Sequence, residues 1–205
     1  MLSLCWFAIA AVAADQPVYE NDFQKAGVGK VPDDLMVIEG SFAVKAEGAD
    51  QFLELAEAPL DTFGALFGPS EVANLSVAAR IYGTNTKRRF PTFGVGLNGV
   101  GGYRLQVAPA KGRLELFKGD VPVAFIAFAW ESGNWTCFKL QSRKGADGSV
   151  TVEGKAWKQG AEEPKGWPLS FTDKEPPAAG RPAIWGSPFS TTPIRYDDLV
   201  VRKVE

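Results

Sequence analysis

Cationic, amide and aromatic side chains recur at alternate positions along several segments of this sequence. The set consists of Arg80, Tyr82, Arg104, Gln106, Lys139 and Trp157. Apolar residues that a folded chain must bury lie beside them, so alternation predicts that the set shares the outer side of one sheet. An aromatic ring can pack on the C–H face of a sugar, and the donor fork of an arginine suits a carboxylate or a sulfate. We therefore expect this face to bind carbohydrate and, because it is cationic, to favour acidic polysaccharide.

Two glycines and one more tryptophan complete this expected site. Gly94 and Gly96 should lie among the set and leave a shallow floor for a ligand. Trp185 precedes Gly186-Ser187-Pro188, a loop-like sequence, and is expected to offer a further binding platform there. The alternative for the whole set is an ordinary solvated surface, since one side of an antiparallel sheet is commonly polar.

Two features that would indicate particular chemistries are missing or incomplete. The sequence contains no histidine, which removes the commonest general base and a common metal ligand. Gly94, Gly96 and Gly99 match the spacing of a dinucleotide-binding loop, but the alternating residues after them predict a strand where that motif needs a helix. The net charge of −2 gives no strong field for nucleic acid.

The elements that must position these residues are short strands. Apolar residues alternate within 93–97, 103–107 and 114–116, and glycine-rich turns at 98–102 and 109–112 join the three segments into an antiparallel meander. About a dozen such segments, and no amphipathic helix of ten residues or more, predict an all-β antiparallel sandwich. We expect less than about a tenth of the chain to be helical.

Residues 1–14 form an apolar run that ends in small residues. We expect a signal peptide cleaved after Ala13 or Ala14, which leaves 15–205 as a single β-sandwich domain. The run is too short to span a bilayer, and its alternative is a buried first strand. Export would place the protein in the periplasm, in the cell envelope or outside the cell. Cys137 would then be the one remaining cysteine, unable to form an intrachain disulfide and expected to be buried and unreactive.

Several motifs resemble those of concanavalin A-like jelly-roll domains. They are Glu20-Asn21-Asp22-Phe23 followed by Pro32 and Glu39-Gly40-Ser41-Phe42-Ala43-Val44, the meander segments, Trp135 at the start of a strand, and Ala179-Gly180-Arg181 through Tyr196-Asp197-Asp198-Leu199-Val200-Val201. The resemblance covers nearly the whole chain after the expected signal peptide. Laminin G-like modules, carbohydrate-binding modules, glucanases and 3-keto-disaccharide hydrolase-type domains share these features. The resemblance therefore implies a concanavalin A-like jelly roll, and the E-x-D-x-x-E signature of the glucanases is absent.

Three aspartates are expected at the junction of the two chain ends. The terminal strands of jelly rolls usually lie side by side, so 18–23 and 194–204 should be neighbours and bring Asp22 close to Asp197 or Asp198. Carboxylate and carbonyl oxygens suit Ca²⁺. Carbohydrate-binding jelly rolls that resemble this chain often carry such a structural calcium ion, and the alternative is a strand-end turn in which aspartate caps backbone N–H groups.

Three functions remain open at this point. The first is an exported, non-catalytic module of the cell envelope that binds glycans or mediates adhesion. The second is a glycoside-acting enzyme, a hydrolase or lyase, of the same superfamily. The third is a structural envelope protein without a small ligand. The absent glucanase signature and the lack of histidine count against the enzyme, and the sequence leaves the oligomeric state open.

Overall fold

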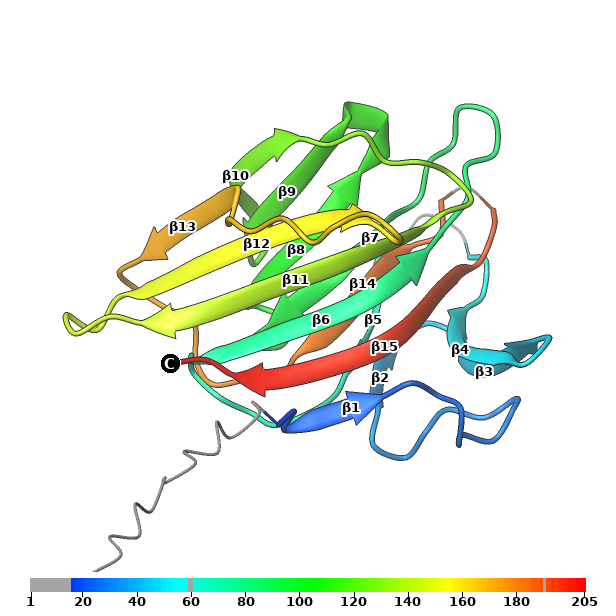
Figure 1. Cartoon of the computed structure of the whole chain (residues 1–205), viewed down its shortest axis with the longest axis horizontal. Helices are drawn as coiled ribbons and strands as arrows, with labels where there is room; N and C mark the ends of the chain where they lie inside the picture. Colours follow the sequence, from blue (N-terminus) through cyan, green and yellow to red (C-terminus); the bar gives the residue numbers. More distant parts are fainter. Residues whose placement is uncertain (1–15, 59–60, 190) are drawn as a thin grey trace, which may run out of the picture.

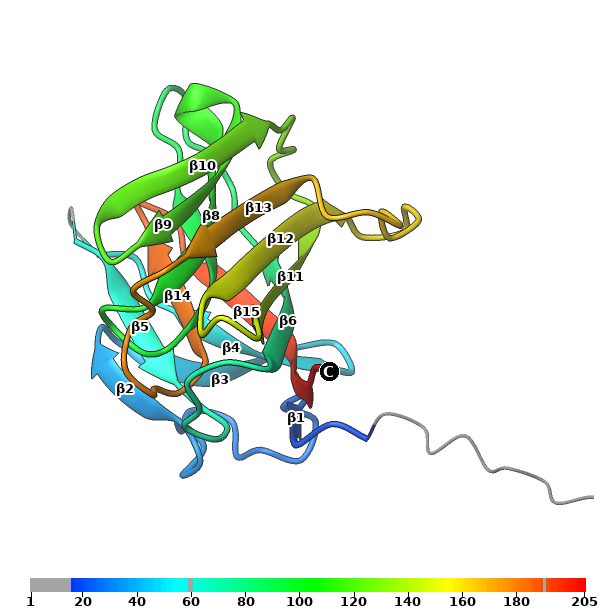
Figure 2. The same cartoon turned by 90° about the vertical axis from the view of Figure 1, so that its left-hand side faces the viewer.

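Alternation of apolar and polar residues produces two antiparallel β-sheets packed face to face, as Figures 1 and 2 show from two directions. The computed structural model describes residues 16–58, 61–189 and 191–205. The predicted signal peptide lies outside these residues. The predicted all-β antiparallel sandwich is confirmed, since the only helix in the described ranges is a short 3₁₀ turn at Pro109–Lys111. No helix in the described part of the chain is long and apolar enough to cross a bilayer.

The two sheets are named A and B here. In spatial order, sheet A contains β13 (Leu169–Asp173), β12 (Val150–Lys158), β11 (Trp135–Lys144), β6 (Leu75–Tyr82), β15 (Ile194–Lys203), β4 (Asp50–Leu55) and β3 (Phe42–Glu47), and β1 (Tyr19–Asn21) pairs with β15. Sheet B contains β10 (Val121–Ala127), β9 (Arg113–Lys118), β8 (Tyr103–Ala108), β7 (Thr92–Leu97), β14 (Ala183–Ser187), β5 (Phe63–Leu66) and β2 (Met36–Glu39). The predicted meander is the run β7–β8–β9 of sheet B.

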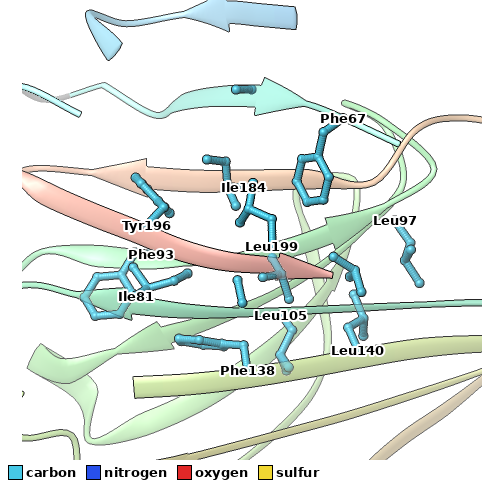
Figure 3. Packing of buried hydrophobic residues seen from close by; sticks show 14 of the residues in the cluster. Phe67, Ile81, Phe93, Leu97, Leu105, Phe138, Leu140, Ile184, Tyr196 and Leu199 are labelled. Atoms are coloured by element: carbon cyan, nitrogen blue, oxygen red, sulfur yellow. The ribbon is translucent and has the colours of Figure 1, made fainter. Parts of the chain in front are cut away.

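The core lies between the sheets and takes one side chain from every second position of the strands (Figure 3). Val77, Leu140 and Val152 reach it from sheet A, and Val95 and Leu105 reach it from sheet B; all five are fully buried, as alternation predicts. The polar neighbours of these residues consequently point away from the core, to the outer face of whichever sheet carries them.

The two ends of the described chain meet in one ladder, as predicted. Strand β1 pairs antiparallel with the second half of β15, and β4 pairs with its first half. Between Asp197 and Val200 the ladder of β15 with β6 contains a bulge, and Asp198 has a positive φ of 51°. A bulge puts an extra residue into one strand and changes where the side chains beside it point.

Candidate functional site

A groove of about 290 Å³ lies on the outer face of sheet A, over β6, β11, β12 and β15. Its floor contains the small side chains of Ser76, Ala78 and Cys137. The segment 159–168, which joins β12 to β13, crosses in front of β12 and β11 in Figure 1 and extends outward on the side of sheet A in Figure 2. This segment contributes Gln159 and Glu163 to the groove.

Three of the predicted ligand-binding residues line this groove. Arg80, Lys139 and Trp157 come from three adjacent strands, and the register explains why they converge. Cys137 of the central strand lies opposite both Arg80 and Trp157, so these side chains stand in one row on one face. Trp157 is half-buried and forms no ring or cation–π pair with the described residues. Alternation along the strands therefore predicted correctly that Arg80, Lys139 and Trp157 share one face of the sheet.

Arg80 is held at one end of the groove by three carboxylates. It forms ion pairs with Asp50 at 3.3 Å, with Asp198 at 3.0 Å and with Asp197. Its guanidinium also lies 4.6 Å from the ring centroid of Trp135. Burial alone would lower the pKa of Arg80, but the three carboxylates outweigh it and raise the pKa.

The bulge in β15 explains how consecutive aspartates can both reach Arg80. In a regular strand Asp197 and Asp198 would point to opposite faces. Here both contact Arg80, although the side chain of Asp197 is fully buried and that of Asp198 is 56% exposed. Burial of the Asp197 carboxyl raises its pKa to about 6, the charge of Asp198 adds to this, and Arg80 and the Asp198 backbone N–H oppose it.

The other end of the groove is cationic. Lys139 lies directly opposite Lys155 in the β11–β12 ladder. The ammonium groups of both lysines contact the same carboxylate oxygen of Glu163, at 3.2 Å and 2.8 Å. Burial would raise the pKa of Glu163, but the two lysines lower it below its ordinary value. The groove is thus polarised, with acidic groups around Arg80 and lysines at the segment 159–168, rather than uniformly cationic as the sequence had indicated.

Tyr82 shares the outer face of sheet A but belongs to a neighbouring aromatic cluster. Its ring packs against Trp135 at a centroid distance of 5.6 Å, and the guanidinium of Arg195 lies 5.3 Å from its ring centroid. Phe52 completes the cluster from β4, with its ring 6.4 Å from that of Trp135. Tyr82 does not line the groove, so a role in binding would require a ligand that extends beyond it.

The prediction that the whole set shares one face is wrong for Arg104 and Gln106, and Trp185, predicted separately to lie in a loop, is found beside them. Strands β8 and β14 belong to sheet B, so these three side chains lie on the opposite outer face of the molecule, together with Gly94 and Gly96. Alternation shows which side of its own strand a residue faces, but it does not show which sheet that strand joins. A binding role for this second set stays a prediction.

Trp185 lies within strand β14 and is only 6% exposed, rather than in a loop as its sequence suggested. Its ring covers two glycines of the neighbouring strands. A Cβ added to Gly64 would lie 2.5 Å from the ring, and one added to Gly96 would lie 2.7 Å from it. Gly96 therefore makes room for Trp185 and is not an open floor for a ligand.

The three aspartates predicted to bind calcium are brought to one region but do not form a ligand set. Asp22 and Asp198 line a second hollow, of about 570 Å³, beside β1. Asp197 instead binds Arg80, and no three acidic, histidine or cysteine side chains of the described residues are placed to hold a metal ion. The residues as arranged do not fit a preformed calcium site. Calcium binding stays a prediction, which thermal melting in EDTA and in calcium chloride would test.

Among the lining residues that the sequence analysis did not assign to the site, Glu163, Gln159 and Cys137 carry functional groups. Glu163 and Gln159 come from an irregular segment without periodicity, where alternation gives no orientation. Cys137 was expected to be buried, but it is half-buried on the groove floor because it alternates with Phe138, which faces the core. Burial raises the pKa of its thiol, while the nearby Arg80 opposes the shift.

Comparison with known proteins identifies the fold. No protein-family model matches the sequence, and no curated protein is similar enough to match it. Among solved structures, the carbohydrate-binding module CBM66 from Bacillus subtilis is 8% identical with a TM-score of 0.55, and the match covers 83% of this chain and 96% of that one. A protein of unknown function with a galectin-like fold, also from Bacillus subtilis, is 14% identical with a TM-score of 0.59, covering 91% and 96%.

A third similar structure belongs to an enzyme. The marine PL-14 alginate lyase from Aplysia kurodai is 11% identical with a TM-score of 0.56, and the match covers 92% of this chain and 99% of the lyase. Identities this low establish the fold alone. Together with the two antiparallel sheets and their strand order, these matches show that the chain has a jelly-roll β-sandwich fold.

Proposed function

We propose that this chain is a non-catalytic glycan-binding module that binds carbohydrate in the groove on the outer face of sheet A. The observation that carries this proposal is the convergence of Trp157, Arg80 and Lys139 on one groove with a floor of small side chains. A tryptophan ring offers a flat apolar surface, and the polar groups around it offer hydrogen bonds, which is the usual composition of a ligand site.

The ionisation of the nearby carboxyl groups argues against glycoside hydrolysis in this groove. A glycosidase needs one carboxylic acid with a raised pKa beside the scissile bond. The pKa of Glu163 is lowered by its lysines, so this residue is a poor proton donor near neutral pH. Asp197 has a raised pKa, but its side chain is fully buried and cannot touch a sugar.

A glycoside-acting enzyme is the second candidate, because Glu163 and Asp198 both line the groove. Chromatography of oligosaccharides incubated with the protein separates the two candidates. A binding module returns its ligand intact, whereas shortened or unsaturated products would establish an enzyme.

Export to the cell envelope forms part of the proposal and rests on the apolar run 1–14. N-terminal sequencing of protein recovered from the periplasm or the medium tests it. A mature chain that begins at Ala14 or Asp15 supports export. An intact Met1 on protein found only in the cytosol would overturn it.

The binding experiment is a glycan array followed by isothermal titration calorimetry with the full chain. Trp157→Ala should weaken binding of the best ligand by up to about tenfold, since contacts of an aromatic ring contribute roughly 0.5–1.5 kcal/mol beyond the buried area. Arg104→Ala is the matched control, because it truncates a half-buried side chain on the outer face of the opposite sheet.

The two variants distinguish the outcomes. Loss of binding in Trp157→Ala alone supports the groove on sheet A. Loss in Arg104→Ala alone would move the site to sheet B. Absence of any bound glycan on the array would favour a structural protein without a small ligand.

A further inference from the structure

The two lysines at the cationic end of the groove would destabilise the folded chain if no anion lay between them. Lys139 and Lys155 are directly opposed across two antiparallel strands. Like charges in that position repel each other and destabilise the sheet. Both ammonium groups contact a single carboxylate oxygen of Glu163, so this carboxylate supplies the compensating charge.

Lys155 makes the need for an anion stronger because its side chain is only 6% exposed. Its ammonium donates to the carbonyl oxygen of Pro164 at 2.6 Å and lies 4.5 Å from the ring centroid of Trp167. A buried ammonium group is stable only when it is hydrogen-bonded and paired with a negative charge. The position of the Glu163 carboxylate is therefore a built anion site.

The side chain of Glu163 is more exposed than the side chains of the two lysines. It is 42% exposed and comes from the segment 159–168, whereas both lysines come from central parts of paired strands. Glu163 and Lys139 line the groove, and the carboxylate of Glu163 also contacts Lys155. A carboxylate that enters along the groove can take the same position when the exposed Glu163 side chain turns outward, while Pro164 and Trp167 keep their contacts with Lys155.

The opposite end of the groove does not offer an equivalent position. Arg80 already pairs with Asp50, Asp197 and Asp198, so an incoming anion there would meet three negative charges. Two cations share one carboxylate at the lysine end, whereas one cation is surrounded by three carboxylates at the arginine end. Charge complementarity therefore assigns an acidic ligand group to the lysines.

We propose that Lys139 and Lys155 form a subsite for the carboxylate of a uronic-acid unit, and that Glu163 occupies this subsite until the sugar displaces it. The proposal rests on the proposed glycan-binding function and names its ligand class. It also makes Glu163 an internal competitor that lowers affinity for acidic glycans and leaves binding of neutral glycans largely unchanged.

The test compares the full chain with Glu163→Gln, which removes the competing charge and keeps an oxygen that can accept from the lysines. The probes are oligosaccharides of galacturonate, mannuronate and glucuronate, each paired with its carboxyl-reduced counterpart of the same linkage. Glu131→Gln is the matched control, because it removes one charge from a surface ion pair with Lys158 outside the groove. Binding is measured by calorimetry at low ionic strength, and mass spectrometry of alkylated peptides reports whether the ligand protects Cys137 on the groove floor.

We expect Glu163→Gln to bind one of the uronates about tenfold more tightly than the unmodified chain, the factor that corresponds to roughly one charge-assisted hydrogen bond. The carboxyl-reduced sugars should not share this gain, and Glu131→Gln should behave like the unmodified chain. Adding Lys139→Gln to Glu163→Gln should cancel the gain. Sodium acetate should not compete at matched ionic strength, since it lacks the sugar that contacts the rest of the groove.

Several outcomes would overturn the subsite. One is equal or weaker uronate binding by Glu163→Gln, and another is an equal gain for the carboxyl-reduced sugars. The subsite would also be overturned if no uronate bound to any variant. The proposed glycan-binding function is tested separately, by the neutral sugars of the glycan array. If reduced sugars protect Cys137 but uronates gain nothing from Glu163→Gln, the glycan-binding function stands and the subsite does not.

Discussion

The variant Arg80→Met should measure how much the ion pair of Arg80 with Asp197 contributes to the free energy of unfolding. The side chain of Asp197 is fully buried, and Arg80 is the only cation that forms an ion pair with it among the described residues. Methionine retains most of the length of arginine but not its charge. Removing one partner of a buried pair leaves an uncompensated charge, so we expect the free energy of unfolding to fall by about 3 kcal/mol near pH 8.

The loss should depend on pH in a defined direction. The folded-state pKa of Asp197 is raised to about 6, above the value near 3.9 for an unfolded chain. The folded state therefore binds this proton more tightly, so the contribution of Asp197 to stability is fully present below about pH 4 and is lost as the pH rises through 6. For a shift of about two units this amounts to roughly 3 kcal/mol. Arg80→Met removes an interaction that lowers the pKa, so its penalty should be largest at pH 8 and shrink in acid.

The measurement is urea unfolding followed by tryptophan fluorescence at pH 4.5, 6 and 8. The variants are Arg80→Met, Asp197→Asn and the double variant, which should recover stability at pH 8 because it contains no buried unpaired charge. Arg143→Met is the control, since its pair with Glu153 lies on the same face with the arginine 45% exposed and should contribute less than about 1 kcal/mol. If Arg80→Met costs no more than Arg143→Met at every pH, the reasoning about a buried charge is wrong.

Two further predictions concern the contacts between and above the sheets. Asp173→Ala should destabilise the chain by about 1–3 kcal/mol in urea unfolding, because it leaves the buried hydroxyl of Tyr103 without the 2.8 Å bond that joins β8 to β13; an unchanged midpoint would contradict this. Gly64→Ala should cost about 1–3 kcal/mol and alter tryptophan emission, because the new Cβ would lie 2.5 Å from the ring of Trp185. Gly101→Ala is its control, since nothing lies within 4 Å of a Cβ there, and equal stability of the two variants would refute the packing argument.

Local patterns predicted the strands and the direction of most side chains. The segment 93–116 shows this clearly, because its three strands are joined by short turns and pair with each other in sequence order. Arg80, Lys139 and Trp157 were placed correctly for a similar reason, since β11 pairs with both β6 and β12. Within one sheet, alternation is sufficient to bring such residues to one face.

The remaining features depend on pairings that join distant parts of the chain. Arg104 shows the same alternation as Arg80, yet β8 pairs with β7 and β9 while β6 pairs with β11 and β15. Nothing local distinguishes the two sheets. The bulge that turns Asp197 and Asp198 toward Arg80 arises only where β15 meets β6, and Glu163 is oriented by the two lysines it contacts.

The junction of β1 with β15 has a mechanical consequence. The backbone N–H of Val18 donates to the carbonyl oxygen of Val201, so the two ends of the described chain leave the fold at the same end of one antiparallel ladder. Tension between these ends would load the hydrogen bonds of that ladder one after another instead of all at once. Strand β1 should therefore peel away at low force, because only three residue pairs join it to β15, whereas the ladders of β11 with β6 and β12 are longer. When the protein is pulled by its two ends, it should therefore lengthen first at the edge formed by β1.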